Sequence, residues 1–173
     1  MQIKIIIIGV LVSCSYLIGD FISKIYTTRH KEVNEIIRIL ENIRSDISFG
    51  RYTLNEVFNR IGNKKDFLLS NFFRCISYDL TKNTDKTLEE VILFNIKNLQ
   101  KESYLNDKDI EELKEVLISL GKSDVSSQQR VIDLSIENFK KTTLETKEDI
   151  EKKGVVYKKL STIIGVMIGI ILI

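Results

Sequence analysis

The sequence predicts an all-α protein, an antiparallel bundle of about six helices that is membrane-anchored by apolar helices at its N- and C-termini. Three observations lead to this fold class. The chain of 173 residues has no proline and only eight glycines, so few residues interrupt helices. Apolar residues recur at helical spacing through its middle, and no stretch alternates as a strand would. Both ends are apolar.

The first apolar stretch runs from Ile5 to Ile22 and contains 18 residues, enough to span a bilayer. Within it, "LVSCS" (residues 11–15) matches the pattern of a lipoprotein processing site that is cut before Cys14. The apolar run continues beyond Cys14, however, and a single lysine precedes it, which is atypical of a cleavable signal. We therefore expect an N-terminal transmembrane anchor over residues 1–27. An extracytoplasmic lipoprotein binding module processed at Cys14 is the alternative.

The second apolar stretch, Leu160 to Ile173, has 14 residues. As a helix it reaches only about 21 Å, so it spans a membrane only if flanking residues are drawn in or lysines snorkel. We place this C-terminal transmembrane segment at residues 156–173. All but one of the bases near the two stretches lie between them: Lys24, Arg29, Lys31, Lys152, Lys153, Lys158 and Lys159. Only Lys4 lies on the other side. The positive-inside rule therefore puts residues 29–153 in the cytoplasm, in a helical domain spanning 28–155.

Both apolar stretches contain small residues four positions apart. Gly9 and Ser13 form such a pair in the first stretch, and Gly165 and Gly169 form a GxxxG pair in the second. Small residues at this spacing let helices approach closely in lipid. Glycine is also simply frequent in membrane helices. If these pairs are contacts, they serve either a hairpin of the two stretches or docking onto a partner's helices.

In the middle of the chain, glycines and capping boxes mark where the helices begin and end. An apolar face runs from Lys31 to Ile47, and Gly50 ends this helix. "TLNE" at 53–56 is a capping box that opens a short helix, which Gly62 closes, and "TLEE" at 87–90 is a second capping box. Further helices are expected at 64–80, 87–99 and 106–120. The last helix begins near Ser123 and is expected to continue to the membrane. The first and last helices should lie side by side.

The chain contains no recognisable catalytic motif. It lacks a glycine-rich phosphate loop, G-x-S-x-G and H-E-x-x-H, and its one histidine, His30, fits a solvated position near the membrane surface. Cys14 and Cys75 have neither disulfide-framework nor metal-ligand spacing. A net charge of +2 does not favour nucleic acid as a partner. We expect no enzymatic activity, no cofactor or metal, and no small-molecule substrate.

Acidic residues suggest a contact surface. Residues 84–115 hold nine acids against five bases, whereas residues 58–74 hold four bases against one acid. A charge run of this kind is usually a solvated helix face, and its functional reading is a docking surface for a basic partner. The candidates are Asp107, Asp109, Glu111, Glu112 and Glu115.

The stretch "SLGKSDVSSQQRVI" (119–132) is a second candidate surface. Gly121 closes one helix, and Ser123 or Asp124 caps the next. Gln128, four residues after Asp124, can form a hydrogen bond with it. The stretch is either a well-capped turn or a polar tip that contacts another protein, with Gly121, Asp124 and Gln128 as its candidate residues.

These motifs resemble the stage III sporulation protein AB family. Gly121, Asp124 and Gln128 stand at the family's Leu-Gly-x-x-Asp-x-x-x-Gln positions. "LENIRSDISFGRYTLNEVFNRI" (40–61) matches a second signature, except that Thr53 stands where the family commonly has proline. The matching positions there are Ile47, Phe49, Gly50, Leu54 and Glu56. The resemblance covers the whole chain.

The resemblance implies a function that spacing alone does not. The family is similar to the platform protein of type II secretion and type IV pilus machines. By this resemblance the chain is a non-enzymatic adaptor in the mother-cell membrane facing the forespore, part of a channel complex between the two cells. Its expected partners are a secretion-type ATPase resembling stage III sporulation protein AA and other membrane components of the channel.

Overall fold

The structure, a computed structural model, describes residues 2–50, 52–82, 85–122 and 124–171. Every regular element in these ranges is helical, as the sequence predicts. The elements are α1 (Gln2–Phe49), α2 (Leu54–Gly62), α3 (Ser70–Lys82), α4 (Leu88–Glu102), α5 (Asp107–Ser119), α6 (Val125–Asp149), the π-helical turn η1 (Ile150–Gly154) and α7 (Val155–Ile171). Because α6, η1 and α7 follow one another directly, the last helix is continuous, with one wider turn that the sequence does not predict.

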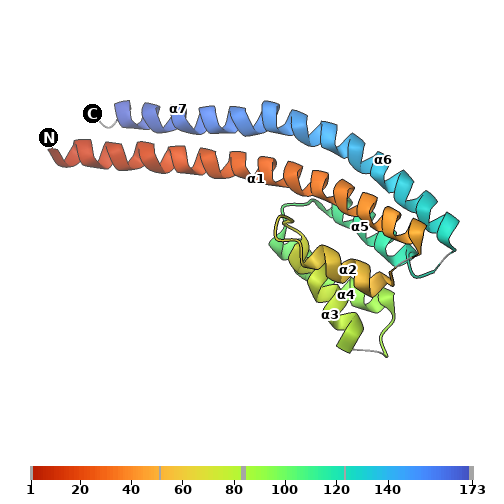
Figure 1. The fold of residues 1–173 in the computed structure, drawn as a ribbon. Coiled ribbons are helices and arrows are strands. Elements are labelled where there is room, and N and C mark those ends of the chain that lie inside the picture. Colours follow the sequence, from red (N-terminus) through yellow and green to blue (C-terminus); the bar gives the residue numbers. More distant parts are fainter. Residues whose placement is uncertain (1, 51, 83–84, 123, 172–173) are drawn as a thin grey trace. The chain divides into compact units, whose positions relative to one another are not determined.

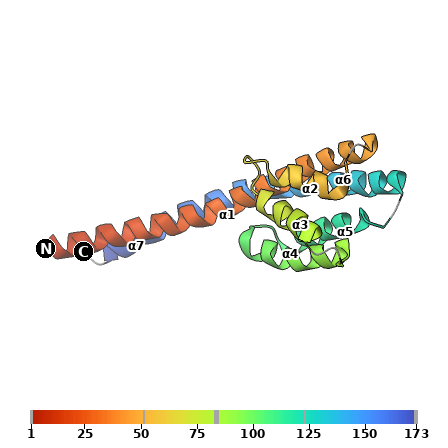
Figure 2. The same ribbon diagram turned by 60° about the horizontal axis from the view of Figure 1, so that its bottom comes forward.

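The chain forms two compact units. The hairpin unit contains Met1–His30 and Leu144–Ile173, and the bundle unit contains Lys31–Thr143. In the hairpin unit, the first part of α1 and α7 run side by side, with the start of α1 beside the end of α7 (Figures 1 and 2). Glycines set their antiparallel register, since Gly169 faces Ile8, Gly165 faces Ser15, and Gly19 faces Ser161.

The bundle unit has one hydrophobic core, to which each of its helices contributes. α2, α3, α4 and α5 pack in sequence order beside residues 31–49 of α1 and residues 125–143 of α6. The largest fully buried side chains are Phe58, Phe73, Phe139, Ile36, Ile39, Leu40, Ile43, Ile61, Ile76, Ile92, Leu113 and Leu117. Burial of this apolar surface, rather than any single contact, holds the helices together.

Helix starts in the bundle unit follow from capping. Thr53 and Thr87 form the two predicted capping boxes with Glu56 and Glu90, which fixes the first turns of α2 and α4. A third box, between Asn106 and Asp109, starts α5. The third box was not predicted because Asp109 lies in a run that reads as a solvated acidic face.

Candidate functional site

The turn between α5 and α6, together with the adjoining ends of the two helices (described residues 119–122 and 124–129), forms the polar tip of the bundle unit. Gly121 lies against α4: a Cβ built on it would be 2.9 Å from Cδ2 of Leu88. Next to it, Lys122 Nζ lies 2.6 Å from Oε2 of Glu89. The turn is thus attached to the first turn of α4 by one apolar and one ionic contact.

Asp124 caps α6 and remains exposed to solvent. Its Oδ2 accepts hydrogen bonds from the hydroxyl of Ser126 and, at 3.2 Å, from the backbone N–H of Ser127. These bonds favour the ionised carboxylate and hold the pKa of Asp124 well below its usual range. The tip therefore presents a fixed negative charge. Ser123, the other predicted cap, lies outside the described residues.

Gln128 supports the turn from its inner side. Its Nε2 donates to the carbonyl oxygen of Leu120, the C-cap of α5, at 2.7 Å. The sequence suggests Asp124 as the hydrogen-bond partner of Gln128. The side-chain amide of Gln128 donates instead to the end of α5, because the last carbonyl groups of a helix have no partner within that helix. Gln128 is half-buried and Asp124 exposed, so the two have different roles.

The five acidic candidates on α5 fall into two groups. Asp109 is buried at 3% exposure and belongs to the capping box, so it does not contribute to an exposed face. Glu112 is half-buried, and its Oε1 accepts hydrogen bonds from Ser135 and Asn138 of α6, at 2.8 and 3.1 Å. These two carboxylates serve the fold of the bundle unit.

The remaining acids, Asp107, Glu111 and Glu115, are exposed and four residues apart, so they share one face of α5. We call them the acidic column. Glu111 forms an ion pair with Lys114. Asp107 and Glu115 have no hydrogen-bond or ion-pair partner among the described residues. The column therefore carries negative charge that the surrounding chain leaves largely uncompensated.

Two buried carboxylates of α1, which the sequence analysis missed, hold the loops of the bundle unit. Glu35 accepts the backbone N–H groups of Leu68 and Leu69, each at 2.7 Å. Glu32 accepts the N–H of Tyr104 at 2.9 Å. The sequence contains a signal that could have revealed them, namely glutamates on the apolar face of a helix. A buried carboxylate requires a hydrogen-bond partner elsewhere in the fold.

Burial affects the ionisation of both carboxyls. It raises the pKa of Glu32 to about 7, with nearby Glu35 and Asp109 acting in the same direction and the N–H of Tyr104 opposing them. Burial likewise raises the pKa of Glu35, against the two N–H groups that it accepts. The loops before α3 and α5 are thus held by carboxyls that are costly to ionise.

In the hairpin unit, the structure separates the two predicted small-residue pairs. Gly165 and Gly169 are buried against α1, where a Cβ would lie 2.6 Å from Cβ of Ser15 and 2.9 Å from Cγ2 of Ile8. Gly9 has nothing within 4 Å, and Ser13 is exposed with its hydroxyl bonded to the carbonyl of Gly9. The side of α1 that α7 uses instead carries Ser15 and Gly19, a pair at the same spacing.

A charged cluster lies between the two apolar helices. Asp20 of α1 is 2.6 Å from Nζ of Lys158 on α7 and 3.0 Å from Nζ of Lys24. The ammonium of Lys158 also lies 5.2 Å from the centre of the Tyr16 ring. One turn further along, the hydroxyl of Ser161 donates to the backbone carbonyl of Ser15. The cluster fixes the register of α1 against α7.

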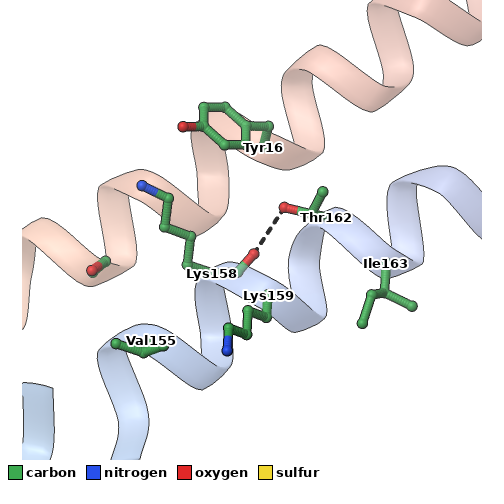
Figure 3. Close-up of a pocket in the computed structure, with 7 residues that line it drawn as sticks. Tyr16, Val155, Lys158, Lys159, Thr162 and Ile163 are labelled. Atoms are coloured by element: carbon green, nitrogen blue, oxygen red, sulfur yellow. Dashed lines mark hydrogen bonds between the residues drawn. The ribbon is translucent and has the colours of Figure 1, made fainter. Parts of the chain in front are cut away.

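Beside this cluster the hairpin unit has an open groove with a volume of about 660 Å³ (Figure 3). Tyr16 and Ser23 of α1 line one side, and Val155, Lys159 and Ile163 of α7 line the other. The Thr162 hydroxyl, which also faces the groove, donates to the carbonyl of Lys158 at 2.9 Å. The lining is mostly apolar.

His30, which the sequence suggests to be solvated, is half-buried. Its Nδ1 lies 2.8 Å from Oγ1 of Thr146, which is 1% exposed, and neighbouring Arg29 pairs with Asp149 at 3.6 Å. In the described ranges no three His, Cys, Asp or Glu side chains gather as a metal site would require. The features that stand out are the polar tip, the acidic column and the groove, all suited to binding.

These features define a class of protein. Two helical stretches, Ile6–Phe49 and Val125–Ile171, are long and apolar enough to cross a membrane, judged by length and composition. An apolar hairpin of this length in the same chain as a polar helical bundle defines the class of helical proteins whose composition fits association with a membrane.

The comparisons with known proteins identify the family. The family model for stage III sporulation protein AB matches residues 4–173. The chain is 28% identical over 158 residues to stage III sporulation protein AB of Bacillus subtilis (strain 168), covering 90% of this chain and 88% of that protein. A solved structure of stage III sporulation protein AB has the same fold, with a TM-score of 0.65 and 20% identity over 71% of this chain and 96% of the other. The chain belongs to the stage III sporulation protein AB family.

Proposed function

We propose that the chain is a non-enzymatic membrane adaptor of a secretion-like sporulation channel between mother cell and forespore. In this role the apolar hairpin anchors the chain in the mother-cell membrane that faces the forespore, and the bundle unit binds a cytoplasmic ATPase of the secretion type. The ATPase expected is one resembling stage III sporulation protein AA. Other membrane components of the channel are the second class of partner.

One observation carries this proposal: the bundle unit exposes carboxylates at its polar tip and along one face of α5. Asp124 is held by two hydrogen bonds and stays exposed, while Asp107 and Glu115 are exposed on α5 without an ionic partner among the described residues. Exposed carboxylates of this kind favour oriented contact with a basic surface, because charge complementarity steers association. Membership in a sporulation family supports the setting.

The hairpin supports the anchor over the lipoprotein alternative. Cleavage before Cys14 would remove Ile8 and Val12, which lie against Gly169 and Gly165 of α7. α1 also continues as one helix through Cys14 to Phe49, with no break where a processing enzyme would cut. A mature lipoprotein would therefore lose the contacts that Ile8 and Val12 make with α7.

The first test measures binding of the ATPase to the full-length chain in detergent. The triple variant Asp107→Asn, Glu111→Gln, Glu115→Gln should weaken binding at least tenfold, and Asp124→Asn should weaken it further. The matched control removes three exposed, separated acids, as Glu41→Gln, Glu137→Gln, Glu145→Gln. The affinity should also fall with added salt if the contact is ionic. Equal losses in the two triple variants would reject the acidic column as the contact surface.

The second test is sidedness. Leu134 is 55% exposed and belongs to the bundle unit, so Leu134→Cys in a Cys75→Ser background gives a reporter on that unit. An impermeant thiol reagent should label it only after lysis of cells with a single membrane. The intact mass of the purified chain should include residues 1–13. Labelling of intact cells, with the mass of a lipid on Cys14, would establish the lipoprotein instead.

A further inference from the structure

The groove of the hairpin unit combines an apolar lining with one uncommitted positive charge. Lys158, at its floor, is bound to Asp20 at 2.6 Å, and Asp20 also binds Lys24 at 3.0 Å. Lys159 lines the groove on the neighbouring position of α7 and has no hydrogen-bond or ion-pair partner among the described residues (Figure 3). A ligand in the groove therefore meets apolar side chains and a single available ammonium.

The position of Lys159 along α7 indicates where this charge lies in a bilayer. Twelve residues separate it from Ile171, the end of α7, a rise of about 18 Å along the helix. Lys159 thus lies at the polar end of the apolar segment, and its long side chain can extend from there toward the headgroups of one leaflet. Ile163, one turn deeper, continues the groove toward the hydrocarbon.

The dimensions and the lining suit a lipid. A volume of about 660 Å³ is within the range of small-molecule sites. Tyr16 places an aromatic ring with a polar tip at this depth, as membrane proteins commonly do at the interface. A net negative headgroup would complement the free ammonium of Lys159, whereas a zwitterionic headgroup brings no net charge to balance it.

We propose that the groove binds one anionic phospholipid, with an acyl chain along Ile163 and the phosphate of the headgroup on Lys159, on the side of Val155. The proposal depends on the hairpin lying in a membrane, as in the proposed function, but not on the ATPase or on the acidic column. The two proposals can therefore fail independently.

The experiment measures lipid binding to the full-length chain in detergent by native mass spectrometry, with phosphatidylglycerol and phosphatidylcholine of the same acyl chains as probes. Phosphatidylglycerol should bind the native chain more tightly. Lys159→Gln should weaken its binding about fivefold, the effect of one cation near an anionic lipid surface. Lys31→Gln, which removes another exposed lysine without an ionic partner, is the matched control and should bind as the native chain does.

A second variant tests the groove itself. Ile163→Trp adds a large side chain to the lining and should reduce phosphatidylglycerol binding even though Lys159 is intact; circular dichroism checks that the helices remain. The proposal is overturned if Lys159→Gln and Lys31→Gln bind phosphatidylglycerol equally, or if the native chain does not distinguish the two lipids. It is also overturned if millimolar inorganic phosphate displaces the lipid, since the site would then bind free phosphate.

Discussion

Glu32 is the residue whose ionisation depends most clearly on folding. Its side chain is 4% exposed and accepts the N–H of Tyr104. The carboxyls nearest to it are those of Glu35 and Asp109, and both disfavour a further negative charge at this position. The folded chain therefore retains a proton on Glu32 at pH values where the unfolded chain has released it.

This difference gives a pH-dependent stability with a definite sign. Between the ordinary pKa of 4.5 and the folded value of about 7, the folded state binds more protons at Glu32 than the unfolded state. The contribution of Glu32 to the free energy of unfolding is full below pH 4.5, declines through this window and levels off above about pH 7. Glu32→Gln should remove this part of the pH dependence while keeping an oxygen for the N–H of Tyr104.

The measurement is the thermal unfolding midpoint of the full chain in detergent from pH 4.5 to pH 8. The difference between native chain and Glu32→Gln should grow in favour of the variant as the pH rises. Glu41→Gln, at an exposed position of the same helix, should follow the native profile. A constant offset between native chain and Glu32→Gln across the range would contradict the raised pKa.

Gly50 and Gly62 are glycines for two different structural reasons. Gly50 has φ +58°, the left-handed conformation that ends a helix, as the sequence predicts. Gly62 was expected to close α2 in the same way, but it is the last residue of the helix and Asn63 is its C-cap. A Cβ on Gly62 would lie 2.7 Å from Cα and N of Arg74, so this glycine lets α2 and α3 approach closely.

The two glycines should respond differently to substitution. Gly62→Ala forces the backbones of α2 and α3 apart and should lower the free energy of unfolding by about 1–3 kcal/mol, as overpacking does. Gly50→Asn, where a side chain has open space and asparagine tolerates a positive φ, should cost much less. Urea unfolding of the full chain, followed by circular dichroism, compares them. A larger loss for Gly50→Asn would contradict this account of Gly62.

At the scale of elements, the helices themselves could be predicted because local signals agree. The capping threonines predicted where α2 and α4 begin. The helical spacing of apolar residues predicted the order of the helices in the bundle unit. The α5 box escaped prediction because Asn106 and Asp109 form a less common version of the motif within an acidic run. The turn η1 escaped because a π-helical turn has no distinct residue pattern.

The faces of the apolar helices could be predicted only in part. α1 carries two pairs of small residues at a spacing of four, Gly9 with Ser13 and Ser15 with Gly19. Spacing alone does not choose between them, since the choice depends on which side of α1 meets Gly165 and Gly169. The partner helix decides, and it lies more than a hundred residues away in the sequence. The same distance hid the pairing of Asp20 with Lys158.

The antiparallel register predicts a specific crosslink. A Cβ on Gly19 would lie 3.0 Å from Cβ of Ser161. The two Cβ atoms of a disulfide lie slightly further apart, so a small shift of the helices would give the required distance. In a background of Cys14→Ser and Cys75→Ser, the pair Gly19→Cys with Ser161→Cys should therefore oxidise to an intramolecular disulfide. Leu17→Cys with Ser161→Cys is the control, because Leu17 is 64% exposed. Electrophoresis without reductant separates the forms, and equal crosslinking of both pairs would reject the register.

At the scale of the whole molecule, the distribution of charge is more compensated than the sequence suggests. Of the four lysines before the second apolar stretch, Lys152 pairs with Glu148, Lys153 with Asp149 and Lys158 with Asp20. The orientation expected from the positive-inside rule is unaffected, because that rule counts bases rather than net charge. Two of these pairs are local, with the acid four residues before the lysine, whereas the pairing of Lys158 with Asp20 depends on the fold. The sequence therefore could not show that Lys159, rather than Lys158, is left without an acidic partner.

The pair of Asp20 and Lys158 should affect the stability of the entire chain. Asp20→Asn leaves Lys158 without its carboxylate between two apolar helices, and Lys158→Met leaves Asp20 with Lys24 alone. Each should lower the thermal unfolding midpoint in detergent and the amount of chain in the membrane fraction. The double variant Asp20→Leu, Lys158→Met should recover most of the loss, because an apolar pair leaves no unpaired charge on these two positions. Additive losses in the double variant would show that the two residues act separately.

The buried carboxylates of α1 also have a consequence for the order in which the chain is made. Glu35 precedes Leu68 by 33 residues, and Glu32 precedes Tyr104 by 72. At about 5–20 residues per second, a ribosome adds the partner of Glu32 about 4–14 seconds after Glu32 itself. The partner of Glu35 is therefore available to the nascent chain well before the partner of Glu32, although both carboxyls lie on a helix that is synthesised first.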